Sequence, residues 1–201
     1  MESSSGVVQK DSLNWLQAFL LGALIISICL NGYLFRRVRT ESGLHFSAQS
    51  ISKSFIGTYV PDLLTKDEAG RQIVVQWKSA PNTVLYYFSP SCIWCRRNSK
   101  ALQSVVAQVG SRYRVVALSA TSTGLTNFEQ KYHLPTQNVM VGAPDSFRTT
   151  LGLIGTPTTI VIDGHGVVRG DWTGAYMGAQ RSDIATFFGI SANSIAPVPL
   201  S

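Results

Sequence analysis

Two cysteines separated by two residues, Cys92 and Cys95, have the residue type and spacing for chemistry. They follow an apolar run that ends at Phe88 and a short turn, where a helix is expected to begin. The free N–H groups of a first helical turn favour an ionised sulfur at Cys92, and Cys95 lies one turn later, within disulfide reach. A thiol whose pKa falls from about 8.5 to about 7 is roughly half ionised at neutral pH and is then a nucleophile.

A structural disulfide and half of a zinc site are the alternatives for this pair. Two thiolates leave a tetrahedral zinc ion two ligands short, and the sequence has no second Cys-x-x-Cys. His45, His133 and His165 are dispersed along the chain, and we interpret each as a surface residue. We therefore expect redox chemistry at the two cysteines and no metal. No flavin or nicotinamide motif is present, so we also expect no cofactor.

Charge and composition exclude other classes of function. The chain has 201 residues, 45% of them apolar, which is enough for one domain with a core and appendages. Its net charge is +6, from 17 basic and 11 acidic residues. The basic residues form no block and no helix face, so nucleic-acid binding is not expected.

The N-terminal region has the pattern of a membrane anchor. No charged residue lies between Asp11 and Arg36, and this is long enough for a helix of about 20 residues to span the hydrocarbon core. We predict an N-terminal tail at 1–12, a transmembrane helix at 13–35 and a linker at 36–57. A cleaved signal peptide is disfavoured because arginines, and not a small-residue cleavage site, follow the apolar run.

The side of the membrane is indicated in two opposite ways. Arg36, Arg37 and Arg39 follow the helix, whereas only Lys10 and the amino terminus precede it, which favours a cytoplasmic domain. An anchored redox domain is most useful where soluble thiol reductants are absent. On that functional argument we predict a single-pass membrane protein whose domain is extracytoplasmic.

Residues 58–190 alternate between strand-like and helix-like patterns, which predicts one α/β domain around a mixed sheet. A helix is expected from Cys92 to Gly110, and another closes the domain at 182–188. Residues 191–201 are expected to be a loose tail. The predicted strands begin at 58–60 and continue at 72–77, 83–88, 114–119, 139–141, 158–163 and 167–172.

The order of these elements resembles the thioredoxin fold, and most of all the membrane-anchored TlpA/ResA-type thiol:disulfide oxidoreductases of bacteria. Two motifs carry the resemblance, which spans about residues 58–190. One is Cys92-Ile93-Trp94-Cys95 after an apolar strand, and the other is Thr156-Pro157 before the strand that begins at Thr158. The expected architecture is therefore a thioredoxin-like mixed sheet flanked by helices, preceded by one N-terminal transmembrane helix.

The resemblance implies roles for individual residues. Cys92 attacks a substrate disulfide, and Cys95 resolves the mixed disulfide that results. Pro157 follows a cis peptide bond, and Thr156 presents backbone groups to an extended substrate segment. Trp94 offers an apolar contact to a protein substrate.

Three positions depart from the family pattern, one of which is Ser91 in place of the tryptophan usual before the first cysteine. Thioredoxin-like reductases commonly have a buried acid six residues before the first cysteine, where this chain has Tyr86. The TlpA/ResA-type proteins often have a glutamate six residues after it, where this chain has Asn98. Proton transfer to and from Cys95 then uses water, Tyr86, Asn98 or another group, or is slow.

The functional prediction is a membrane-tethered thiol:disulfide oxidoreductase. Its expected partners are disulfide-containing proteins, for example apocytochromes during maturation, an upstream thiol reductant, and the membrane through the N-terminal helix. One alternative is a thioredoxin-fold copper chaperone that holds Cu(I) between Cys92 and Cys95 without turnover. Another is a structural adaptor that needs neither cysteine.

Overall fold

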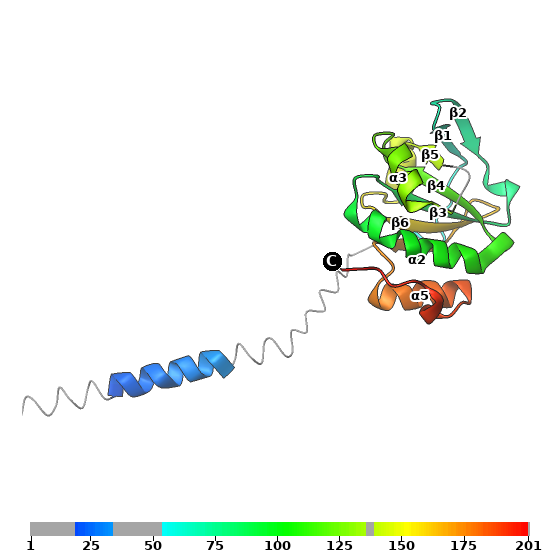
Figure 1. Cartoon of the computed structure of the whole chain (residues 1–201). Helices are drawn as coiled ribbons and strands as arrows, with labels where there is room; N and C mark the ends of the chain where they lie inside the picture. Colours follow the sequence, from blue (N-terminus) through cyan, green and yellow to red (C-terminus); the bar gives the residue numbers. More distant parts are fainter. Residues whose placement is uncertain (1–18, 34–53, 136–138, 201) are drawn as a thin grey trace, which may run out of the picture. The chain divides into compact units, whose positions relative to one another are not determined.

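The computed structural model describes residues 19–33, 54–135 and 139–200 (Figure 1). The chain divides into two compact units, Met1–Ile51 and Ser52–Ser201. In the first unit, residues 19–33 form a helix whose large apolar side chains are exposed. None of the helices in the described ranges is both long enough and apolar enough to cross a membrane. The range predicted for the anchor, 13–35, extends at both ends beyond the described residues. The predicted tail at 1–12 and most of the predicted linker at 36–57 lie outside them.

The described part of the second unit contains a seven-stranded mixed sheet with the order β2-β1-β5-β4-β3-β6-β7. β4 pairs in parallel with β3 and with β5, whereas β3–β6, β6–β7, β1–β5 and β1–β2 are antiparallel. The strands are β1 (Leu63–Asp67), β2 (Gln72–Val75), β3 (Asn82–Phe88), β4 (Arg114–Ser119), β5 (Val139–Val141), β6 (Thr158–Asp163) and β7 (Val168–Thr173).

Helices cover the sheet on both faces (Figure 1). The α-helices of this unit are α2 (Ile93–Val109), α3 (Leu125–Tyr132), α4 (Asp145–Thr150) and α5 (Gly178–Phe188). In the described part of this unit, three short 3-10 helices accompany them: η1 (Trp77–Ser79), η2 (Gly110–Arg112) and η3 (Ala192–Ser194).

Strand β3 lies inside the sheet, between β4 and β6, and its side chains enter two cores. Tyr86 and Phe88 belong to the core that also contains residues of α2, α3 and α5. Leu85 and Tyr87 belong to the core on the other face, with η1 and α4. This alternation is the two-residue period of a strand covered on both faces, and it explains why the run is apolar throughout.

The β3–β4 register defines the edge of the sheet that carries the dithiol turn. The two strands run in parallel from Thr83↔Arg114 to Phe88↔Ser119, so their carboxyl ends lie side by side. The turn from β3 into α2 leaves the sheet at this edge.

The predicted strands at 114–119, 139–141 and 158–163 are confirmed, but the N-terminal part of the domain differs. The prediction at 58–60 was wrong, because this segment makes only an isolated bridge between Tyr59 and Val167. Strand β1 follows it and was not predicted. β1 has few buried apolar residues, and its buried Thr65 is satisfied by hydrogen bonds to the carbonyl oxygens of Val141 (3.2 Å) and Gly142 (2.6 Å).

The last segment also differs from the prediction of a loose tail at 191–201. Residues 191–200 form η3 and then pack on the domain, and Ile195 in this segment is fully buried. Ile195 and Val198 join the core beneath α2 and α5, which supplies the apolar contact that a free tail lacks. The closing helix α5 also begins earlier than expected, at Gly178.

Candidate active site

Cys92 occupies the N-cap of α2. Its backbone is extended (φ −72°, ψ 119°), and its N–H donates to the Ser89 carbonyl at 3.0 Å, which closes the turn after β3. The Cys92 Sγ accepts the backbone N–H of Cys95 at 3.2 Å. A sulfur at the N-cap thus takes the hydrogen bond that a serine or aspartate oxygen usually accepts there. The same free N–H groups and helix dipole favour a negative charge on it.

The loop before β6 brings a second backbone group to this sulfur. The Thr156–Pro157 peptide bond is cis, as the resemblance implies. In its thiol form, Cys92 donates to the Thr156 carbonyl at 3.3 Å, although the two residues are 64 positions apart. The Pro157 carbonyl accepts from Gly174 N–H at 2.7 Å, so the loop is also tied to the end of β7. The fold therefore joins the two predicted motifs at one point.

The two sulfur atoms differ in their tendency to ionise. Partial burial opposes ionisation of Cys92, but hydrogen bonds from Cys95, from the Thr156 side chain and from the Trp94 backbone outweigh it and lower the pKa of Cys92. Cys95 is fully buried, and this burial, with the hydrogen bond to Cys92, raises the pKa of Cys95 to about 12. Both are free thiols in this structure. The arrangement is that of an accessible nucleophile backed by a protected thiol.

Tyr86 and Asn98, which stand where the resemblance leads one to expect acids, contact each other close to Cys95. Tyr86 and Asn98 are both fully buried, and the Asn98 amide donates to the Tyr86 hydroxyl at 3.4 Å. The Asn98 carbonyl oxygen accepts the Tyr176 N–H at 2.8 Å, which fixes the orientation of the amide. Sequence reasoning missed Tyr176, whose hydroxyl is hydrogen-bonded to Thr159 at 2.7 Å. No spacing signal connects residues so far apart in the chain.

Trp94 lies on the outer side of the site and is 37% exposed. The guanidinium carbon of Arg97 lies 5.1 Å from the centre of its ring, one helical turn further along α2. Ile154, two residues before Thr156, is 97% exposed and was not singled out from the sequence. Exposed apolar side chains therefore occur on both segments that meet at Cys92.

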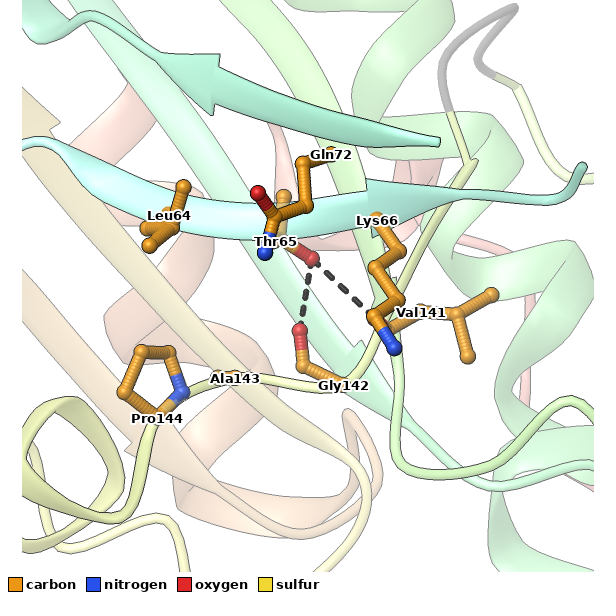
Figure 2. A pocket seen from close by; sticks show the side chains of 8 residues that line it. All are labelled: Leu64, Thr65, Lys66, Gln72, Val141, Gly142, Ala143 and Pro144. Atoms are coloured by element: carbon orange, nitrogen blue, oxygen red, sulfur yellow. Dashed lines mark hydrogen bonds between the residues drawn. The ribbon is translucent and has the colours of Figure 1, made fainter. Parts of the chain in front are cut away.

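A separate pocket of about 400 Å³ lies beyond the carboxyl end of β5 (Figure 2). Thr65, with its hydrogen bonds to Val141 and Gly142, forms part of its wall. The pocket includes neither cysteine, so it is distinct from the dithiol site. Its other lining residues are Leu64, Lys66, Gln72, Ala143 and Pro144.

The remaining site predictions concern metals and histidines. Within the described part of the chain, no three or more His, Cys, Asp or Glu side chains gather closely enough to hold a metal ion. His165 is exposed in the turn before β7, and His133 ends α3 with a left-handed backbone (φ 46°). His45 lies outside the described residues.

Solved structures share this architecture. A candidate thiol:disulfide interchange protein DsbE from Chlorobium tepidum matches with a TM-score of 0.55 and 18% identity, over 70% of this chain and 98% of that one. The fold is thioredoxin-like. A thiol:disulfide interchange protein of the thioredoxin family, also from Chlorobium tepidum, matches with a TM-score of 0.50 and 20% identity, over 65% and 94% of the two chains.

A third similar structure is an exposed lipoprotein thioredoxin from Streptococcus pneumoniae, with a TM-score of 0.50 and 15% identity, over 65% of this chain and 100% of that one. No family model matches the sequence, and neither does any curated protein. The similarity is thus one of fold, and it extends over nearly the whole of each related chain. The thioredoxin-like domain carries its dithiol at the start of α2, beside the cis Thr156–Pro157 bond.

Proposed function

We propose that this chain is a thiol:disulfide oxidoreductase that acts on disulfides of other proteins. The Cys92 thiolate attacks one sulfur of the substrate disulfide, and that S–S bond breaks as a mixed disulfide forms. The departing substrate sulfur takes a proton. Cys95 then loses its proton and attacks Cys92, which releases the second substrate thiol and leaves a Cys92–Cys95 disulfide. An upstream thiol donor returns two electrons and two protons to the pair.

One observation supports this function above all others. The Cys92 sulfur is partly accessible, accepts the Cys95 N–H at 3.2 Å and lies 3.3 Å from the Thr156 carbonyl, while Cys95 is buried behind it. A structural disulfide does not require one accessible and one protected thiol. Ordered exchange, in which the first thiol attacks and the second resolves the mixed disulfide, does require this difference.

Reduction of insulin disulfides by the full chain, with dithiothreitol as electron donor, tests this function. We expect Cys92→Ser to return the rate to the background of dithiothreitol alone. Cys95→Ser should retain the attack and accumulate a mixed disulfide visible by mass spectrometry. Equal rates for the wild type and Cys92→Ser would contradict the proposal. Retention of Cu(I) without any turnover would instead support the copper-chaperone alternative.

We also propose that the domain is tethered to a membrane and acts on the extracytoplasmic side, where its substrates include proteins such as apocytochromes. The support is the charge-free sequence between Asp11 and Arg36, and the usefulness of an anchored reductant where soluble thioredoxin is absent. Arg36, Arg37 and Arg39 favour the opposite orientation. A topology reporter fused after Ser201 distinguishes the two sides, and a cytoplasmic signal would remove the proposed maturation role.

A further inference from the structure

Residues 191–200 run back along α2 towards the dithiol. The Gln108 side chain donates to the Ser194 carbonyl at 3.3 Å and accepts from the Ser194 hydroxyl at 2.6 Å. The Ser104 hydroxyl accepts the Ala196 N–H at 3.1 Å. The Arg97 guanidinium then donates to the Leu200 carbonyl at 2.9 Å. The chain runs antiparallel to α2, as the red segment of Figure 1 shows, and arrives at its first turns.

The middle of this segment is buried in the core, whereas its end is exposed to solvent. Ile195 is fully buried, and Val198 packs against the same core. Leu200 is 75% exposed. Positions 97, 104 and 108 of α2 are spaced by seven and four residues, so they lie on one face of the helix. The segment therefore has a fixed course and presents an apolar side chain at its end.

Arg97 connects this end to the Cys-x-x-Cys motif. Its guanidinium group lies 5.1 Å from the centre of the Trp94 ring and also binds the Leu200 carbonyl. A planar guanidinium can stack by its face and donate from its edge at the same time, which a lysine ammonium cannot do. One side chain thus holds both Trp94, two residues after the nucleophile, and the segment that ends at Leu200.

We propose that residues 197–200, together with Trp94 and held by Arg97, form one wall of the surface that binds the partner protein beside Cys92. This inference rests on the proposed function. The occupant it fits is an extended polypeptide segment with apolar side chains next to its cysteine.

Two features favour that occupant. The exposed side chains of the wall, Trp94 and Leu200, are large and apolar, and Ile154 presents a third on the loop that carries Thr156. Across the site, that loop contributes a backbone carbonyl 3.3 Å from the Cys92 sulfur. An extended segment satisfies backbone groups and inserts alternate side chains, whereas a small disulfide such as bis(2-hydroxyethyl) disulfide reaches only the sulfur.

Arg97→Ala in the full chain separates binding from chemistry. We expect the KM for insulin to rise about 3- to 10-fold, as for the loss of one cation–π contact and one hydrogen bond to a charged group. The rate with bis(2-hydroxyethyl) disulfide, and kcat with insulin, should stay within about twofold of the wild type. Lys100→Ala is the matched control, because it removes an equal charge from an exposed position of α2 and should leave both substrates unaffected.

Leu200→Gln provides a second variant that does not disturb packing, because the side chain is mostly exposed and only the backbone carbonyl binds Arg97. It should also raise the KM for insulin alone. An unchanged insulin KM in both folded variants would overturn the proposal, as would an equal loss of rate with both disulfides. If the wild-type chain reduced neither disulfide, the proposed function itself would fail and this inference with it.

Discussion

Cys92 and Cys95 are one helical turn apart, and the protein environment gives them opposite tendencies. Hydrogen bonds that converge on the Cys92 sulfur lower its pKa against the opposing effect of partial burial, while burial raises the pKa of Cys95 to about 12. The nucleophile can therefore be distinguished from the resolving thiol by its titration alone.

Alkylation of the reduced chain by iodoacetamide over a pH series measures this difference. Because only the thiolate reacts and the pKa of Cys92 is lowered, Cys92 should reach half of its maximal rate at a lower pH than a cysteine in an unstructured peptide. Cys95 should remain unmodified throughout this range. Mass spectrometry of peptides assigns each site, and a Cys92 midpoint equal to that of the peptide would contradict the assignment.

The buried hydroxyl of Tyr86 lies close enough to Cys95 for an electrostatic interaction between the two groups, which makes it a candidate to assist Cys95. It accepts a hydrogen bond from Asn98, so its own proton remains available, and Asn98 lies on the same face of α2 as Cys95, three residues away. We expect Tyr86→Phe to slow release of the mixed disulfide while attack by Cys92 is unchanged. Quenched-flow measurement with insulin separates the two steps, and equal slowing of both would exclude a specific effect on Cys95.

At the scale of elements, α2 connects the dithiol with strand β3 and with residues 191–200. Asn98 binds β3 through Tyr86 and the residues before α5 through Tyr176, and residues 97, 104 and 108 bind η3 and the segment after it. The helix that carries the reactive sulfur is thus held on two sides by buried and exposed contacts. This fixes the N-cap geometry on which the ionisation of Cys92 depends.

Ile195→Ala tests whether the last segment is part of the fold. Because Ile195 is fully buried, its truncation should cost about 2–4 kcal/mol in the free energy of unfolding. Leu200→Ala, at a position that is 75% exposed, should change it by less than about 0.5 kcal/mol. Urea denaturation compares the two variants, and equal, small effects would show that the segment is not packed in solution.

The sequence predicted the elements whose signal is local. The strand at 158–163 has three consecutive β-branched apolar residues, Ile160-Val161-Ile162, and the Cys-x-x-Cys helix combines an apolar face with Gly110 at its end. Other features depend on contacts between distant residues. Thr65 is polar in the sequence but buried, because Val141 and Gly142 offer it carbonyl oxygens. Ile195 lies in a segment with two prolines, Pro197 and Pro199, and no helix or strand pattern, so its burial becomes evident only once α2 and α5 are in place.

At the scale of the whole molecule, the carboxylate of Glu129 makes the free energy of unfolding depend on pH. Burial and the neighbouring carboxylate of Glu68 raise the pKa of Glu129 in α3 from 4.5 to about 7. Among the described residues, the Glu129 Oε1 atom is buried and has no hydrogen-bond partner. The folded chain therefore binds a proton that the unfolded chain has already released, and the free energy of unfolding falls as pH rises from about 4.5 to about 7.

Glu129→Gln should remove this dependence. We expect the variant to be more stable than the wild type above pH 7, with the difference vanishing below pH 4.5, where the glutamate is protonated in both states. Thermal unfolding of both chains at about pH 4, 6 and 8 measures this stability difference. Asp145→Asn, which changes an exposed carboxylate in α4, serves as control. A stability difference that did not change with pH would contradict the assignment.

The contact between Arg97 and the Leu200 carbonyl has a practical consequence for handling the protein. A purification tag or fluorescent protein appended directly after Ser201 would be attached one residue from the wall beside Trp94. Such a fusion should obstruct large substrates but still allow small ones to reach the sulfur. A long, flexible spacer before the tag should restore access. The spacer length at which activity on large substrates returns would therefore measure how closely a docked protein approaches that end.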